Sequence, residues 1–92
     1  MKLDEVNDLL DKVFECFPKE SKNRIGDIFY EKPEVSVYDE KAEGYKLFIK
    51  ASIINESALN CIKSIVQKRK LKYFWATHKS EKVFVIYTPR KA

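Results

Sequence analysis

Glycine and histidine are scarce in this sequence, and no long hydrophobic run is present. Only two of the 92 residues are glycine and only one is histidine. Two glycines are too few for the glycine-rich fingerprint of dinucleotide-binding domains, and Gly26 and Gly44 stand too far apart to form a P-loop. The longest unbroken apolar stretch, Val83–Tyr87, has five residues, whereas a membrane-spanning helix needs about 20. We therefore expect no membrane partner.

Cysteine is rare as well. Cys16, Cys61 and His78 are the only cysteine and histidine residues, and a zinc site normally takes four ligands at short spacings, so we expect no metal and no cofactor. Asp4 and Glu5 stand where a secretory signal would be apolar, which predicts a cytoplasmic location. In that compartment both cysteines are expected to be reduced and to act as small core hydrophobes.

The composition is that of one small folded domain covering residues 1–92. Hydrophobic residues make up 45% of the chain and charged residues 35%. The apolar share is sufficient for a core, while a chain of this length leaves no room for a second domain.

Two segments carry apolar residues at helical spacing. Across residues 6–17 they recur every three or four positions, with Asp4 as the expected N-cap and Pro18 as the end. Asn55 is the expected N-cap of a second helix, whose apolar stripe covers residues 58–66.

Runs of alternating or β-branched apolar residues predict four strands. The expected strands are Glu34–Tyr38, Tyr45–Ile53, Leu71–Thr77 and Val83–Thr88. Before them, Ile25, Ile28 and Phe29 are expected to form one short helical turn. Gly44 is expected to supply a positive φ after the first strand, and residues 78–82 are expected to form a loop with His78 in solvent.

The element order is thus α-β-β-α-β-β. Two hairpins joined by a helix favour a two-layer α+β fold, with a four-stranded, mainly antiparallel sheet and both helices on one face.

Charge is distributed unevenly between the two halves of the chain. Residues 1–43 hold seven Lys and Arg against twelve Asp and Glu, whereas residues 44–92 hold eleven against two. Such asymmetry indicates either an anionic partner for the basic half or mutual compensation of the two halves.

The second and third predicted strands suggest where an anionic partner would bind. Side chains alternate across a strand, so if the helices cover the uniformly apolar face, basic and aromatic residues share the other. That face would carry Lys46, Phe48, Lys50, Lys72 and Phe74. Rings among lysines suit single-stranded RNA or DNA, since bases stack on rings and ammonium groups meet phosphates. Lys68, Arg69 and Lys70 are expected to add peripheral phosphate contacts, although cations also favour helix C-termini for their dipole alone.

The sequence therefore predicts a small non-catalytic binding module, with single-stranded nucleic acid or another polyanion as the first ligand candidate. An alternative uses the same face for a protein partner or a homodimer, because contiguous exposed apolar surface usually marks an interface. The pattern lacks the glycines of the RNP1 motif, so the nucleic-acid prediction rests on composition. No set of residues resembles a catalytic constellation, and an enzyme is not expected.

Overall fold

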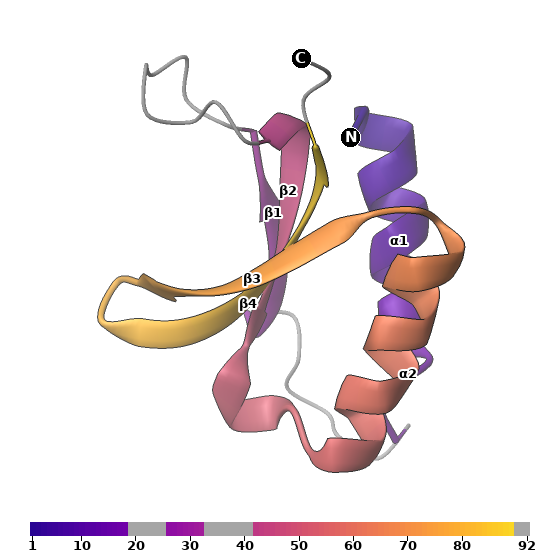
Figure 1. Ribbon diagram of the computed structural model, residues 1–92. Helices are drawn as coiled ribbons and strands as arrows, with labels where there is room; N and C mark the ends of the chain where they lie inside the picture. Colours follow the sequence, from indigo (N-terminus) through magenta and orange to yellow (C-terminus); the bar gives the residue numbers. More distant parts are fainter. Residues whose placement is uncertain (19–25, 33–41, 90–92) are drawn as a thin grey trace.

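The computed structural model describes residues 1–18, 26–32 and 42–89. These residues form two α-helices and a four-stranded antiparallel sheet (Figure 1). The elements are α1 (Leu3–Phe14), β1 (Ile28–Glu31), β2 (Ala42–Lys50), the 3-10 turn η1 (Ala51–Ile53), α2 (Glu56–Lys68), β3 (Lys72–His78) and β4 (Glu81–Pro89). The strand order is β1-β2-β4-β3. The predicted α+β fold with both helices on one face of the sheet is confirmed.

The helices begin close to the predicted positions. In α2 the Asn55 cap is confirmed, because the Ala58 N–H donates to Asn55 Oδ1 at 2.7 Å. In α1 the N-cap is Lys2 and not Asp4, which lies within the first turn together with Glu5. Acidic side chains at that end of a helix interact favourably with its dipole.

The first strand lies earlier in the chain than predicted. Ile28–Glu31 pairs antiparallel with β2, with Ile28 opposite Ile49 and Phe29 opposite Phe48. The predicted helical turn at Ile28 and Phe29 is therefore wrong: Ile28 points into the core beneath the helices while Phe29 packs on the other face. Ile25 and the predicted strand Glu34–Tyr38 lie outside the described residues.

The second strand ends at Lys50, and the residues predicted to continue it form η1 instead. At its beginning Gly44 has the expected positive φ, 73°, beside an irregularity in the β2–β4 register. The Tyr45 N–H donates to the Met1 carbonyl at 2.7 Å, and the Met1 amine donates to the carbonyl oxygens of Glu43 and Tyr45. Partial burial lowers the pKa of that amine. A Cβ on Gly44 would collide with the Met1 backbone, so this close approach also requires glycine.

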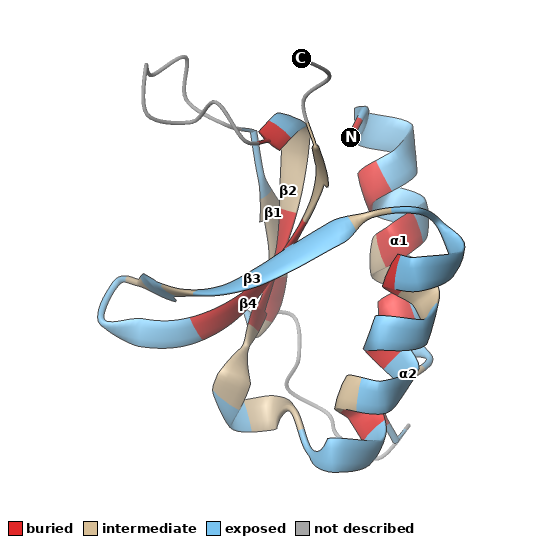
Figure 2. Cartoon of the chain, in the orientation of Figure 1, coloured by how far each residue is buried: buried red, intermediate tan, exposed pale blue. Residues whose placement is uncertain are grey.

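The main core lies between the helices and the sheet. Its largest fully buried side chains come from α1, α2 and the two central strands, and include Leu9, Leu47, Ile49, Ile62, Phe84 and Ile86. Figure 2 shows the buried positions on the inner sides of α1 and α2, whereas β3 is exposed along most of its length. The helices thus cover the middle of the sheet and leave its β3 edge uncovered.

A two-residue turn connects β3 to β4, in place of the predicted five-residue loop. His78 is the last residue of β3 and faces Glu81 across the hairpin. Lys79 and Ser80 have φ angles of 50° and 67°, which are typical of a type I′ turn, the type whose twist matches a hairpin. Asn-Gly is the usual sequence of this turn, because a positive φ is sterically unfavourable for most other residues.

Replacing Lys79 by Asn together with Ser80 by Gly should therefore raise the free energy of unfolding by about 1 kcal/mol. For a domain of this size that corresponds to a rise in Tm of roughly 4–8 °C, measurable by thermal circular dichroism. The matched control is Ser80→Ala, which retains a Cβ at positive φ and should give no gain. Equal stabilisation by both changes would contradict the turn assignment.

A disulfide joins the two helices. Cys16, directly after α1, is bonded to Cys61 of α2, with their Cα atoms 5.7 Å apart. The expectation of two reduced cysteines is therefore wrong. Periodicity places each cysteine near one helix, but it does not reveal that these helices lie side by side.

Candidate functional site

The sheet face opposite the helices, here called the open face, carries the predicted aromatic residues. Phe48 lies on it but is only 8% exposed. The Phe29 ring stacks on it with centroids 5.1 Å apart, and the His78 ring lies 5.3 Å away. The prediction of an exposed Phe48 is therefore wrong. The helices do not cover this ring; Phe29 of β1 and His78 of β3 do.

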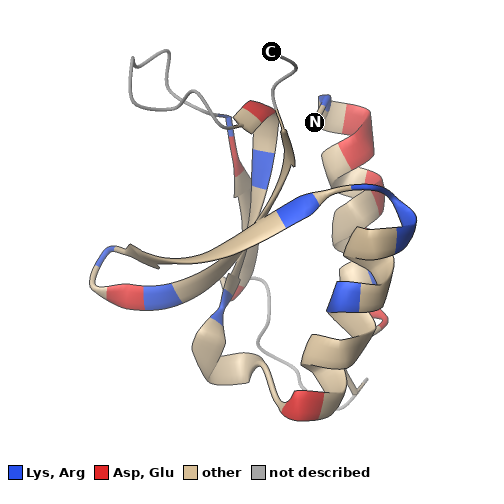
Figure 3. Cartoon of the chain, in the orientation of Figure 1, with Lys and Arg blue, Asp and Glu red and all other residues tan. Residues whose placement is uncertain are grey.

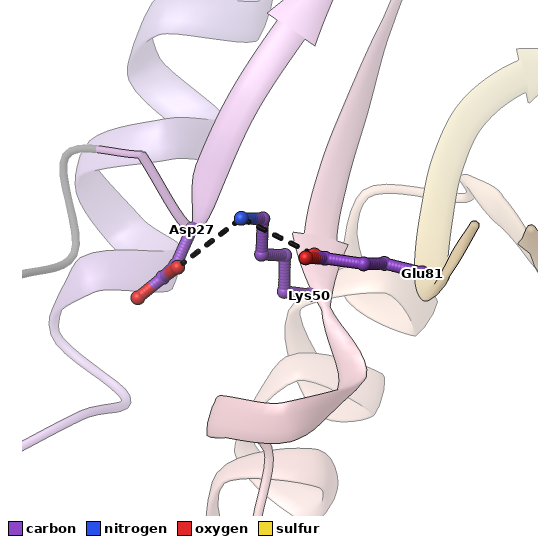
Figure 4. Close-up of polar contacts among 3 residues, drawn as sticks. All are labelled: Asp27, Lys50 and Glu81. Carbon is purple, nitrogen blue, oxygen red and sulfur yellow. Dashed lines mark ion pairs between the residues drawn. The ribbon is translucent and has the colours of Figure 1, made fainter. Parts of the chain in front are cut away.

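The two lysines that β2 contributes to the open face are engaged in local interactions. Lys50 Nζ lies 3.2 Å from Glu81 and 3.7 Å from Asp27, so it bridges two carboxylates (Figure 4). Lys46 faces Glu31 in the β1–β2 register and also has a partner. Two acidic side chains, Asp27 next to β1 and Glu81 of β4, thus balance the positive charge expected at Lys50.

A small pocket of about 330 Å³ lies at this end of the open face, lined in part by Phe29, Lys50 and Glu81. His78 and Glu31 also line it, with His78 Nε2 3.5 Å from Glu31 Oε1. The prediction of a fully solvated His78 in a loop is wrong, since this side chain is 25% exposed and sits on a strand. The pocket mixes both signs of charge, and the described residues contain no cluster of three or more metal-ligating side chains.

The exposed aromatic residues are concentrated on β3. Among the described residues four large hydrophobic side chains are exposed, namely Leu3, Tyr73, Phe74 and Trp75. The last three are consecutive, and we call them the β3 aromatic strip. Phe74, 38% exposed, points to the open face and packs edge-on against Tyr87. Lys72 is exposed on the same strand.

Tyr73 and Trp75 point to the helix side of the sheet, yet each is 41% exposed. They flank the buried Phe84 ring, at centroid distances of 4.8 Å and 5.0 Å. The alternation along the strand predicts this face correctly, but it does not predict that β3 is an edge strand beyond the helices. Neither residue is therefore among the site residues predicted from the sequence. Their consecutive position in Tyr-Phe-Trp was the available signal.

Cations lie directly against these two rings. Lys63 Nζ of α2 is 5.6 Å from the Tyr73 ring centroid, and Lys82 Nζ of β4 is 4.8 Å from that of Trp75. Such contacts hold an ammonium group at the ring face. A shallow groove of about 410 Å³ continues between α2 and β3, lined in part by Lys63, Gln67 and Lys72.

The predicted peripheral cations divide into paired and exposed groups. Arg69 donates to Asp8 of α1 at 2.6 Å, so part of the acidic half does compensate the basic half within the chain. Lys68 and Lys70 are exposed at the end of α2. Figure 3 shows acidic positions along α1, with basic positions at the end of α2 and along the β3–β4 hairpin. Over residues 42–89 the exposed basic side chains therefore lie on α2, at its end and on the β3–β4 hairpin, beside the β3 aromatic strip.

Comparison with known proteins identifies no relative: no family model, curated protein or solved structure matches the chain. Over the described ranges, neither helix has the length and apolar character needed to cross a membrane. The assignment of a role therefore rests on the β3 aromatic strip and the charges around it.

Proposed function

We propose that this chain is a non-catalytic binding module that binds single-stranded nucleic acid along the β3 aromatic strip. The observation that carries the proposal is the run of three exposed rings on one edge strand, with Lys63 and Lys82 against two of them. Proteins that bind single strands combine stacking rings with a positive surface along the backbone path.

The spacing of the rings supports this use. Tyr73 and Trp75 share one face and are two residues apart, hence about 7 Å apart along the strand. That separation allows each ring to take one base of an extended strand. The buried Phe84 beneath them limits their movement, so little side-chain entropy remains to be lost on binding.

The surrounding charge supports an anionic ligand. From residue 56 to residue 89 the chain holds seven Lys and Arg against two Glu. Lys68, Lys70 and Lys72 are exposed beside the strip. In this proposal they meet phosphates, as do Lys63 and Lys82 when bases displace them from the rings. Phe48, Lys50 and Arg69 take no part, since the first is buried and the other two are in ion pairs.

We also propose that the chain has no catalytic activity of its own. Both cysteines are bonded to each other, so neither offers a thiolate nucleophile to His78. A cytoplasmic location stays a prediction. Because of the disulfide it holds only for a cytosol in which such bonds persist, as in hyperthermophiles.

The test uses fluorescence anisotropy with a labelled oligodeoxythymidine of about 12 nucleotides. Trp75→Ala and Tyr73→Ala should each weaken binding by roughly 5- to 100-fold, the equivalent of about 1–3 kcal/mol for one stacked base. Trp75 is the only tryptophan, so stacking should also quench the intrinsic fluorescence of the unmodified protein. The affinity should fall steeply with added salt because phosphate contacts release counterions.

Leu3→Ala is the matched control, because Leu3 is an apolar side chain of similar exposure, 44%, on α1. It should leave affinity unchanged. Equal losses in the Leu3 and Trp75 variants, or an affinity that does not depend on salt, would contradict the proposal.

A further inference from the structure

The outer edge of β3 has no neighbouring strand among the described residues, since β3 is last in the order β1-β2-β4-β3. Across a two-residue turn, His78 and Glu81 exchange both backbone hydrogen bonds, and every second residue of β3 then bonds to β4. The N–H and C=O groups of Tyr73, Trp75 and Thr77 consequently point to the open edge. Such a row of groups is a template for an added strand.

This edge is poorly protected against pairing. Natural edge strands are usually blocked by charged residues, proline or bulges. The β3–β4 register is regular, and Lys72 at the start of β3 is its only lysine. The middle of the strand is the aromatic strip, whose exposed parts leave about 250 Å² of ring surface per chain.

We propose that the occupant of this edge is β3 of a second copy of the chain, running antiparallel with Phe74 on the two-fold axis. Pairing of one strand with its own copy is an isologous contact that closes on a dimer. Phe74 then faces Phe74 of the second copy, and Tyr73 faces Trp75 twice. Cross-strand aromatic pairs of this kind stabilise a sheet, and the backbone groups of Tyr73 and Trp75 become paired.

The rings distinguish this register from its neighbour. If Trp75 lay on the axis, Tyr73 would face Thr77 and Phe74 would face Ala76 of the second copy, so only the two Trp75 rings would meet. With Phe74 on the axis, every ring of the strip faces a ring of the second copy. Aromatic pairs directly opposite each other are favourable in a sheet, so the strand is most self-complementary about Phe74.

The exposed area sets the strength of the contact. Two copies contribute about 500 Å² of ring surface, and with the strand backbone the total remains at the low end of specific interfaces, below roughly 1,200 Å². We therefore expect a weak dimer, formed at about 10–500 µM protein and dissociated on dilution. Added salt should strengthen it, because the two basic edges repel each other.

Site-directed cysteine cross-linking tests the register. In Phe74→Cys the two introduced sulfurs lie across a pair with Cα atoms about 4.5 Å apart, close enough for a disulfide. In the matched variant Lys72→Cys the corresponding positions are offset by about 13 Å along the strands. Under mild oxidation we expect covalent dimers from Phe74→Cys in at least tenfold excess over Lys72→Cys on non-reducing gels.

A charge-swap experiment tests the two-fold axis independently. Sedimentation equilibrium should show the unmodified chain rising from 10.9 kDa toward twice that mass with concentration, whereas Phe74→Lys and Phe74→Glu each remain monomeric. An equimolar mixture of the two variants should dimerise again, because opposite charges then meet across the axis. Circular dichroism checks that each variant is folded; where one is not, the cysteine pair decides the outcome.

An unmodified chain that stays monomeric to about 1 mM would overturn the proposal, since even a weak specific dimer would form there. Equal cross-linking of the two cysteine variants, or association only with an unrelated protein, would overturn it as well. Nucleic-acid affinity falls with salt whereas this dimer gains from it. The two proposals can therefore fail separately.

Discussion

Replacing Phe48 by Ala should lower the free energy of unfolding by about 3–5 kcal/mol, the range found when a buried phenylalanine is truncated. The ring is 8% exposed and forms a second apolar cluster with Val83 and Val85 on the open face. Its removal leaves Phe29 and His78 without the ring on which they pack. A domain of this size has about 5–14 kcal/mol of stability in total, so the loss is a large fraction. Urea unfolding followed by circular dichroism measures it.

Phe74→Ala is the matched control, since the same group is removed from the same face, two strands away. Phe74 is 38% exposed and keeps one edge-on ring contact, so its truncation should cost about 1 kcal/mol or less. The experiment thereby separates a core ring from an exposed one. Equal losses for the two variants would contradict the burial described for Phe48.

The parts of the fold that the sequence predicts are those with a long periodic pattern. Both helices show several turns of apolar spacing, and the Asn55 cap follows from the preference of asparagine for that position. The last two strands are long enough for alternation to identify them. β1 is different because its four residues, Ile28–Glu31, are too few to separate a strand from a helical turn by period.

The errors at the candidate site arise from strand order, which local patterns do not specify. Alternation places Phe48 on the open face, but its burial depends on Phe29 from β1 and on His78 from the far end of β3. The same limitation applies to Trp75. Alternation along β3 places it on the helix side of the sheet, yet only the edge position of β3 shows that no helix covers it. The side of the sheet to which a residue points follows from the local sequence, whereas its exposure depends on which elements lie next to its strand.

Whether a charge is paired also depends on which elements are neighbours. Lys50 is one of several lysines in the basic half of the sequence, and from composition alone it is predicted to contact phosphate. In the fold it lies between Asp27 and Glu81, two carboxylates from segments distant in sequence (Figure 4). Lys72 has no acidic residue opposite it, since it faces Tyr87 in the register. The positive field available to a ligand is therefore shifted toward β3.

Removing the Cys16–Cys61 disulfide by replacing both cysteines with Ser should lower the free energy of unfolding by about 2–4 kcal/mol. The bond closes a segment of 45 residues that contains β1 and β2, and restricting the unfolded chain over that length accounts for about 4 kcal/mol in the chain-entropy treatment. Tm should fall by roughly 10 °C or more. Thermal and urea unfolding of the two proteins, each with and without reductant, measure the effect.

The reductant provides the internal control for this prediction. Reductant should lower the free energy of unfolding of the unmodified protein by nearly as much as the two substitutions do. It should leave the stability of the double-serine variant unchanged, because only the unmodified protein has a disulfide to break. A loss caused by the substitutions themselves would instead appear in the variant while reductant left the unmodified protein unaffected. That second pattern, or two free thiols titrated in the native protein, would show that the helices are held together by packing of Val6, Leu9 and Ile62 in the core without a covalent link.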